Sequence, residues 1–276
     1  MRQTTSHKLW LIAPAALMVG IFFLYPLCFS LYSAITLDGS LTLTHLDKAF
    51  DLYSKDILFT IIIVLISVAI LAILSITIAA LITLSPFRSL TKTLGFLYRL
   101  PLFIPFIVTA QMMRTFLAKN GLMNNAFVAS GLLTPMDTVS FLGWSGIIIT
   151  FVWKQLAFST LLISGAMAAL DESQIRAARN LGASRLRILL QIILPQIIPT
   201  LGVAIVLSIV TMMSVLSVPL MIGTGSPTMM TADMAFRINS YGDYHVANAL
   251  GLVSYCICAG LAWFYLRQNL KEKGAN

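Results

Sequence analysis

Long apolar runs separated by short polar segments dominate this 276-residue chain. The runs are continuous rather than alternating, which excludes the residue pattern of a membrane β-barrel strand. Crossing a bilayer core of about 30 Å takes roughly 20 helical residues. By that length the sequence predicts six spans, at 9–34, 57–84, 94–118, 141–168, 197–222 and 246–266. We therefore predict an all-α membrane protein with a single transmembrane domain over 1–276.

The third run, 94–118, carries the weakest signal. Arg99, Pro101, Pro105 and Arg114 interrupt its apolar residues. Proline removes a backbone donor and kinks a helix, and a charge within a span must face protein or water. We expect this span to bend.

The first run, 9–34, follows basic residues as a secretory signal would. It is about twice as long as the apolar region of a signal peptide, and no clear cleavage site follows it. We expect it to be a retained first span.

Composition supports a lipid environment, because 58% of the residues are hydrophobic and only 10% are charged. Soluble domains carry about 25% charged residues. The net charge of +8 does not indicate nucleic-acid binding, since no basic run has interleaved aromatic residues. Cys28, Cys256 and Cys258 all fall inside apolar runs and are expected to be small buried hydrophobes rather than disulfide or metal partners.

Basic residues gather at one set of span ends. Arg88 and Lys92 follow the second span, several arginines follow the fourth, and Arg267 and Lys271 follow the last. Cytoplasmic loops of membrane proteins are enriched in Lys and Arg. The distribution predicts that both termini lie in the cytoplasm.

The polar segment between the fourth and fifth spans is the most informative part of the sequence. Asp171 and Ser173 are good helix-capping residues, so a short helix is expected to run from there to Leu181. Gly182 would end that helix, since glycine adopts the left-handed conformation without penalty. A second helix is expected to start near Ser184.

The second helix has an expected apolar face made of Leu186, Leu189, Leu190 and Ile193, at three- and four-residue spacing. Small residues at the bend before it would let another protein approach the backbone closely. A basic loop lying on anionic headgroups is the alternative, with about 1 kcal/mol for each Lys or Arg near the surface. Physical arguments alone leave these two interpretations open.

The spacing of this segment resembles the Glu-Ala-Ala motif of ABC importer permeases. Ala177-Ala178, Gly182, Ile192 and Leu194-Pro195 stand at the motif's spacing without a gap, and the six spans match the family plan. The family's glutamate is replaced by Arg176, which reverses the charge there. The resemblance implies a type I ABC importer permease fold whose cytoplasmic coupling helix lies in the loop 171–195. The ATPase-coupling residues that it implies are Arg176, Ala177, Ala178, Leu181, Gly182, Ala183, Ile192, Leu194 and Pro195.

The resemblance also implies the partners. They are two ABC ATPase subunits, a second permease subunit that is different or identical, and an extracytoplasmic solute-binding protein, all at a bacterial inner membrane whose lipid surrounds the spans. ATP and Mg would be bound by the ATPase subunits, so no cofactor is expected in this chain. Consistent with this, the sequence has no G-x-x-x-x-G-K-[ST] phosphate loop. We expect a transport subunit rather than an enzyme.

Two groups of residues are candidates for the translocation path. Lys154 lies within the fourth span with Gln155 and Ser159 nearby, and a charge inside a span is a functional candidate. The alternative is that Lys154 reaches the membrane surface or pairs with a backbone carbonyl. The second group lies along the fifth span and consists of Met212, Met213, Ser214 and Ser217. These residues suit a gate, and helix packing would explain them equally well.

The charges within the predicted spans bear on the class of solute. The predicted spans contain Lys154 but no Asp or Glu, which favours a small polar or anionic organic solute, such as a phosphonate, over a polyamine. The resemblance covers permeases for polyamines, phosphonates and iron, and the segment 223–249 also resembles sugar permeases, so a sugar or polyamine stays the alternative. A secondary transporter driven by an ion gradient is the rival of a different class.

Overall fold

The computed structural model describes residues 4–37, 39–223 and 225–274. They form two compact units. Unit 1 comprises Met1–Ser54 with Asp233–Ile257, and unit 2 comprises Lys55–Ala232 with Cys258–Asn276. The predicted single domain over 1–276 stays a prediction.

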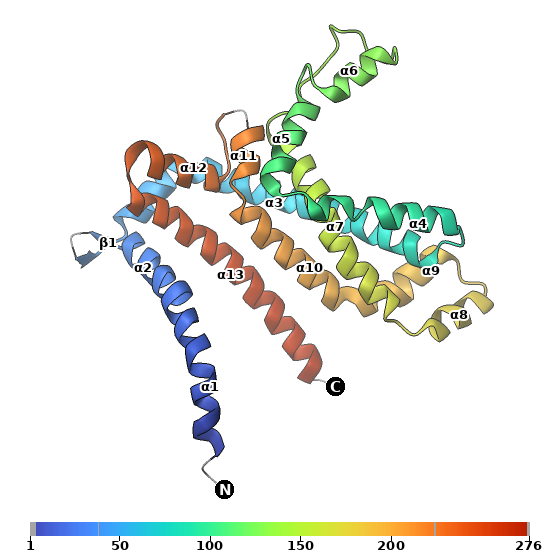
Figure 1. Cartoon of the computed structure of the whole chain (residues 1–276), viewed down its shortest axis with the longest axis horizontal. Coiled ribbons are helices and arrows are strands. Elements are labelled where there is room, and N and C mark those ends of the chain that lie inside the picture. Colours follow the sequence, from blue (N-terminus) through green and yellow to red (C-terminus); the bar gives the residue numbers. More distant parts are fainter. Residues whose placement is uncertain (1–3, 38, 224, 275–276) are drawn as a thin grey trace. The chain divides into compact units, whose positions relative to one another are not determined.

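The N-terminal helix of unit 1 is continuous but contains a π-helical turn. α1 (Thr4–Val19) passes through the turn Gly20–Leu24 into α2 (Tyr25–Ala34) without leaving helical backbone angles (Figure 1). Its part Ile12–Ala34 is long and apolar enough to cross a membrane. This agrees with the first predicted span.

A short hairpin follows α2. Strands β1 (Thr36–Leu37) and β2 (Ser40–Leu41) pair antiparallel, with Thr36 opposite Leu41. This hairpin is a small departure from the all-helical prediction.

The next helix, α3 (Thr44–Leu84), is much longer than the predicted span 57–84. Its first turns were missed because they are amphipathic rather than apolar. His45, Ala49 and Tyr53 are buried at four-residue spacing, whereas most of the residues between them are exposed. A polar helix end of this kind gives no hydropathy signal.

The third predicted span is two helices with a sharp bend. α4 (Arg88–Leu97) leads through a 3-10 turn (Leu100–Phe103) to α5 (Phe106–Leu117), and the helices of this bent pair differ in direction by 110°. Pro101 stands in the turn and Pro105 in extended backbone just before α5. The expected bend is confirmed. In the described part of the chain, five helices qualify as spans, or six if this pair counts as one.

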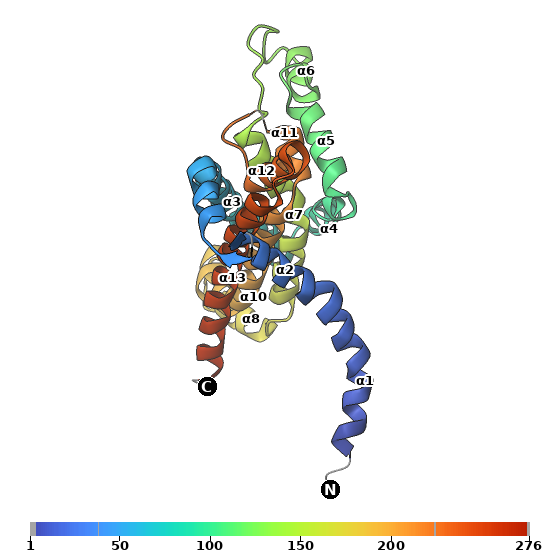
Figure 2. The same ribbon diagram turned by 90° about the vertical axis from the view of Figure 1, so that its left-hand side faces the viewer.

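The short helix α6 (Leu122–Ala129) follows α5 in unit 2 (Figure 2). Asn124 holds its loop closed, because its side-chain amide donates to the carbonyls of Ala118, Lys119 and Val139 at 2.8–3.1 Å. The segment between the third and fourth spans is therefore ordered rather than a loose connector.

The centre of unit 2 is α7 (Trp144–Ala168), the most buried of the candidate spans, with 67% of its apolar window inside the structure. It packs against α10 (Leu194–Ser214), α5 and α11 (Ser217–Ile222). The fifth span was predicted at 197–222, and the structure differs from that range at its start and by a break before α11. Helix continues upstream to Arg185, and it breaks after Ser214 because Val215 has extended backbone, with ψ of 121°.

The C-terminal part begins with α12 (Met230–Phe236) and a π-helical turn (Arg237–Tyr241), and it ends with α13 (Tyr244–Gly274). The prediction of buried cysteines was wrong for two of the three: Cys28 and Cys256 are exposed, and Cys258 is partly buried. The apolar runs that hold them are helices with much of their surface uncovered in this single chain, so an apolar sequence position did not imply burial.

Candidate coupling loop and translocation path

The predicted helix of the polar segment is α8 (Glu172–Asn180), and its start is capped as expected. The Asp171 carboxylate accepts from the backbone N–H of Ser173 at 2.8 Å and from its hydroxyl at 2.7 Å. Hydrogen bonds from the Ser173 side chain and backbone lower the pKa of Asp171. The carboxylate therefore stays ionised at neutral pH and keeps the helix start closed.

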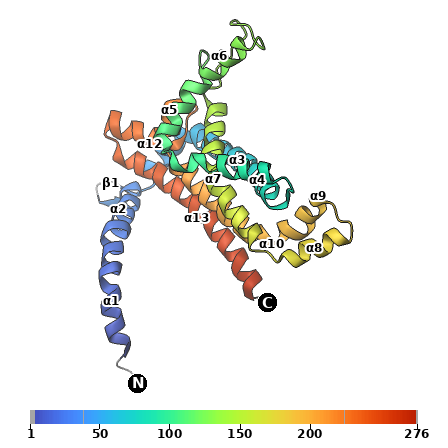
Figure 3. The same ribbon diagram turned by 45° about the vertical axis from the view of Figure 1, so that its right-hand side comes forward.

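The bend after α8 is open to its surroundings. Gly182 has φ of +79°, and a Cβ built on it would meet nothing within 4 Å. Leu181 beside it is 89% exposed. The Ser184 hydroxyl then caps the next helix, α9 (Arg185–Ile188), by accepting from the backbone N–H of Arg187 at 3.3 Å. The expected helix, glycine bend and second helix are all present, side by side at one end of α10 (Figure 3).

The opposite face of the loop is anchored in a hydrophobic cluster. Ile175 of α8 and Ile188 of α9 pack there against the ends of α3 and α7. The buried members of the cluster are Ala79, Leu84, Ile163, Met167, Ile175, Ile188, Ile193 and Ile197. The loop is thereby joined to the ends of the spans by a close-packed cluster, which deforms little.

The expected apolar face of the second helix was partly wrong. Leu186 and Leu190 are 64% and 52% exposed, whereas Ile188 and Ile193 are fully buried. The π-helical turn at Leu189–Ile193 explains the difference, since its wider spacing places residues five apart on one face.

The coupling residues implied by the family motif fall into an exposed group and a partly buried group. The exposed ones are Arg176, Ala177, Leu181, Gly182 and Pro195. The partly buried ones, which pack against the cluster, are Ala178, Ala183, Ile192 and Leu194. One side of the motif is thus free to meet a partner while the other side holds the loop to the spans.

Arg176, the charge-reversed position, has its partner on its own helix. Its guanidinium donates to the Glu172 carboxylate at 2.5 Å, with both side chains mostly exposed. That contact also raises the pKa of Arg176. The i,i+4 spacing of Glu172 and Arg176 was a readable signal for this pair, and the sequence interpretation missed it.

In the first predicted pathway group, Lys154 is 8% exposed, and its ammonium donates to the carbonyl of Pro101 at 2.7 Å. This is the alternative in which the charge pairs with a backbone carbonyl. The ammonium also lies 5.2 Å from the centroid of the Phe106 ring. Lys154 therefore ties α7 to the break between α4 and α5, while Gln155 and Ser159 are buried beside it on α7.

In the second group, Met212 and Met213 are buried near the end of α10, whereas Ser214 is exposed and donates to the carbonyl of Thr211 at 2.9 Å. Ser217 is partly buried and opens α11. The helix break lies between the two serines. A role of either group in the translocation path stays a prediction.

A further anchor in unit 2 was not predicted. The buried Asp56 carboxylate accepts from the backbone N–H of Thr228 at 2.5 Å, and the Thr60 hydroxyl accepts from that of Met230 at 3.0 Å. Both bonds fix the segment before α12 to α3. Sequence reasoning had no signal for them, because the paired residues stand about 170 positions apart.

Comparison with known proteins begins with the sequence. Residues 53–270 match the family described as "binding-protein-dependent transport system inner membrane component". A probable ABC transporter permease, y4fN of Sinorhizobium fredii, is 33% identical over 135 residues, which are 49% of this chain and 23% of that protein. The sulfoquinovosyl glycerol permease SmoG of Agrobacterium fabrum is 27% identical over 148 residues, which cover 48% of each chain. The matched segments thus span less than half of these two relatives.

The fold also matches solved structures. A chain of a bacterial alginate ABC transporter, crystallised with an alginate-bound periplasmic protein, aligns over 96% of both chains with a TM-score of 0.80 and 21% identity. A chain of the MetNI methionine ABC transporter aligns over 78% of this chain and 93% of its own, with a TM-score of 0.59 and 15% identity. With its bent third span, its anchored loop and a family match over most of its length, this chain belongs to the binding-protein-dependent transport system inner membrane components.

Proposed function

We propose that this chain forms half of the translocation path of an ATP-driven importer for a saccharide or glycoside, and that the loop 171–195 couples it to an ATPase subunit. The observation that carries the coupling role is the two-sided loop. Its bend exposes Leu181 and Gly182 without any neighbour of its own chain over the glycine. Its other face is buried against α3, α7 and α10. A partner pressing on the bend would thereby move three spans together.

The solute class rests on two observations. Relatives are named for sulfoquinovosyl glycerol, trehalose and maltose, and α-glucoside transport. In addition, the expectation of a phosphonate-like anion drew on the charge of Lys154, whose ammonium is buried and bonded to the carbonyl of Pro101 rather than exposed to a solute. The names of these relatives give a polyhydroxyl solute the better support, and the sugar alternative replaces the phosphonate.

The proposed assembly is that of the family: two ATPase subunits, a second permease subunit and an extracytoplasmic solute-binding protein, in an inner membrane with both termini of this chain in the cytoplasm. The positive-inside distribution supports that orientation. The separate binding protein would set most of the specificity.

Affinity purification of the tagged chain from its own cell membranes tests the class. We expect an ATPase subunit with a phosphate loop and a second permease to co-purify, and we expect ATP hydrolysis by the complex. Uptake that collapses with an uncoupler but survives ATP depletion would favour a secondary transporter instead.

The solute is tested on the co-purifying binding protein. We expect mono- or oligosaccharides or their glycosides to raise its melting temperature and phosphonates and polyamines to leave it unchanged. Stabilisation by a phosphonate alone would overturn the saccharide assignment without affecting the coupling role.

A further inference from the structure

Two adjoining cavities in unit 2 lie where α3 ends beside the coupling loop. The first has a volume of about 390 Å³ and is walled by apolar side chains, among them Leu81, Leu90 and Leu186. The second, of about 430 Å³, is lined by hydroxyl groups, by the bend itself and by Arg179 and Arg185. Leu84, Ser85 and Arg185 line both cavities. The polar cavity, hereafter the polar chamber, thus adjoins the apolar cavity, hereafter the apolar chamber.

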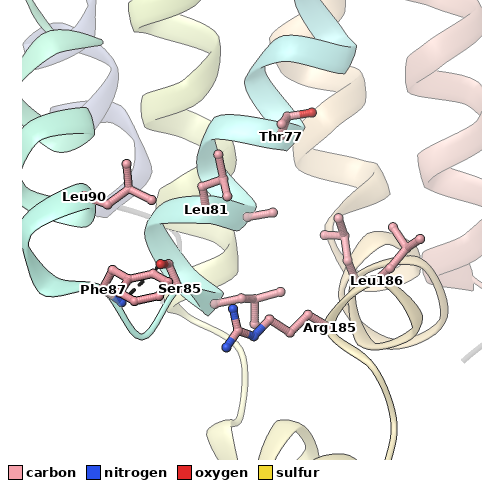
Figure 4. A pocket seen from close by; sticks show the side chains of 10 residues that line it. Thr77, Leu81, Ser85, Phe87, Leu90, Arg185 and Leu186 are labelled. Atoms are coloured by element: carbon pink, nitrogen blue, oxygen red, sulfur yellow. Dashed lines mark hydrogen bonds between the residues drawn. The ribbon is translucent and has the colours of Figure 1, made fainter.

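Arg185 stands at the junction of the two chambers. Its side chain reaches from α9 toward Ser85 at the end of α3, and Leu81 and Leu90 face the space beside it (Figure 4). The Ser85 hydroxyl accepts from the backbone N–H of Phe87 at 3.2 Å and so holds the turn that separates α3 from α4. The Arg185 side chain is itself exposed, so its guanidinium is open to a ligand from outside the chain.

The charges lining the polar chamber are of one sign. Neither cavity is lined by a carboxylate. In the described part of the chain, Arg179 and Arg185 take part in no ion pair. A guanidinium binds phosphate through two parallel hydrogen bonds, so the chamber suits a phosphate group.

The expected position of the cavities along the membrane normal suits a lipid headgroup. The apolar helices α3 and α7 end near this point, at Leu84 and Ala168, which is where a bilayer core gives way to headgroups. A headgroup phosphate in the polar chamber would leave an acyl chain pointing toward the apolar chamber. Basic pockets between spans on the cytoplasmic side are a known way of holding anionic headgroups.

We propose that the paired cavities bind one anionic phospholipid, with its phosphate on Arg185 and Arg179 and an acyl chain beside Leu81 and Leu90. Gly182 and Ala183 line the polar chamber, so the bound lipid would support the coupling bend from behind. This assignment needs only that the chain lies in a membrane, and it is independent of the transported solute.

Native mass spectrometry of the full-length, delipidated chain in detergent tests the proposal, with phosphatidylglycerol and phosphatidylcholine as probes. We expect one phosphatidylglycerol to bind about tenfold more tightly than phosphatidylcholine. Arg185→Gln should remove this preference, and Arg185→Lys should keep part of it. Leu81→Trp should fill the apolar chamber and weaken binding of both lipids. Arg267→Gln, a basic residue of α13 that lines neither cavity, should behave as wild type.

Equal binding of the two lipids, or a preference that Arg185→Gln leaves unchanged, would overturn the proposal. If inorganic phosphate displaced the lipid at a concentration similar to that of the lipid, the polar chamber would be assigned to a soluble anion instead. If the ATPase subunit displaced the lipid, the chamber would be assigned to that partner. Thermal unfolding of each variant provides the folding control. Lost binding in a variant that melts like wild type counts for the proposal.

Discussion

At the scale of single residues, two features define the surface of the coupling loop. They are the backbone conformation at Gly182 and the ion pair that Arg176 forms. The left-handed backbone at Gly182, with φ of +79°, costs other residues about 1–2 kcal/mol, and the space over it is empty in this chain. Arg176 is paired within α8 rather than presented alone. We infer that the shape of the bend, more than its charge, fits the partner.

Gly182→Trp should uncouple ATP hydrolysis from transport, because the indole would fill the space that a partner must enter. The measurement is ATPase activity and solute uptake of the reconstituted complex. Gly131→Trp is the matched control, since Gly131 also has positive φ, at +74°, and an open Cβ position. Normal uptake by Gly182→Trp would contradict the coupling assignment.

Arg176→Glu should leave assembly with the ATPase largely intact. Exposed ion pairs contribute little, and the Glu172 partner lies on the same helix rather than on another protein. Co-purification of the ATPase with the variant is the measurement. If the ATPase subunit no longer co-purified with the variant, the Arg176 side chain would contact the partner directly.

Lys154→Met should destabilise the chain rather than alter only its solute preference. The buried carbonyl of Pro101 would lose its donor, at a cost of about 1–3 kcal/mol. We expect a melting temperature lower by several degrees in detergent, and a smaller loss for Lys154→Arg, which can still donate. An unchanged melting temperature with altered solute selectivity would instead place Lys154 in the path.

At the scale of elements, helix breaks and close helix contacts decide the arrangement. Pro101 and Pro105 separate α4 from α5, and extended backbone at Val215 separates α10 from α11. Within unit 2, α10 and the end of α13 meet at Gly202, where a built Cβ would lie only 2.1 Å from the ring of Tyr265. The Tyr265 hydroxyl donates to the carbonyl of Pro199 at the same contact.

Gly202→Leu should weaken the packing of α13 on α10, because the added side chain would displace the Tyr265 ring. Overpacking of this kind costs about 1–3 kcal/mol. We expect a lower melting temperature that Tyr265→Ala partly restores in the double variant. Gly260→Leu, at an open Cβ position, should have little effect. Equal melting of the two leucine variants would rule out the close contact.

At the scale of the whole molecule, the unpaired apolar surfaces and the distribution of basic residues define how the chain lies in the membrane. The candidate span Ile12–Ala34 has none of its apolar window buried, against 67% for α7. Such surfaces are expected to face lipid or a second permease subunit. The basic residues around the coupling loop predict that this loop and both termini lie in the cytoplasm.

Cysteine labelling tests this orientation. Ser130→Cys and Ser184→Cys, both at exposed positions, are introduced separately after Cys28, Cys256 and Cys258 are replaced by serine. A membrane-impermeant maleimide should label position 130 in intact spheroplasts and position 184 only after permeabilisation. The reverse pattern would invert the proposed topology.

Local physics made much of this protein predictable from its sequence. The apolar runs indicated most of the long helices and the prolines indicated the bend. The caps at Asp171 and Ser184, with Gly182 between them, indicated the two short helices of the loop. Each of these features depends on residues a few positions apart. The resemblance to the family motif then led to the coupling role that we propose for the loop.

Tertiary structure decided what depends on distant residues. The partner of Lys154 is the carbonyl of Pro101, and the partner of Asp56 is the backbone of Thr228. Neither contact leaves a periodic signal, because its two members lie on separate elements. The same holds for the exposed faces of Cys28 and Cys256. A hydrophobic residue in a membrane protein is apolar whether it faces lipid or protein, so only the packing of the helices distinguishes the two.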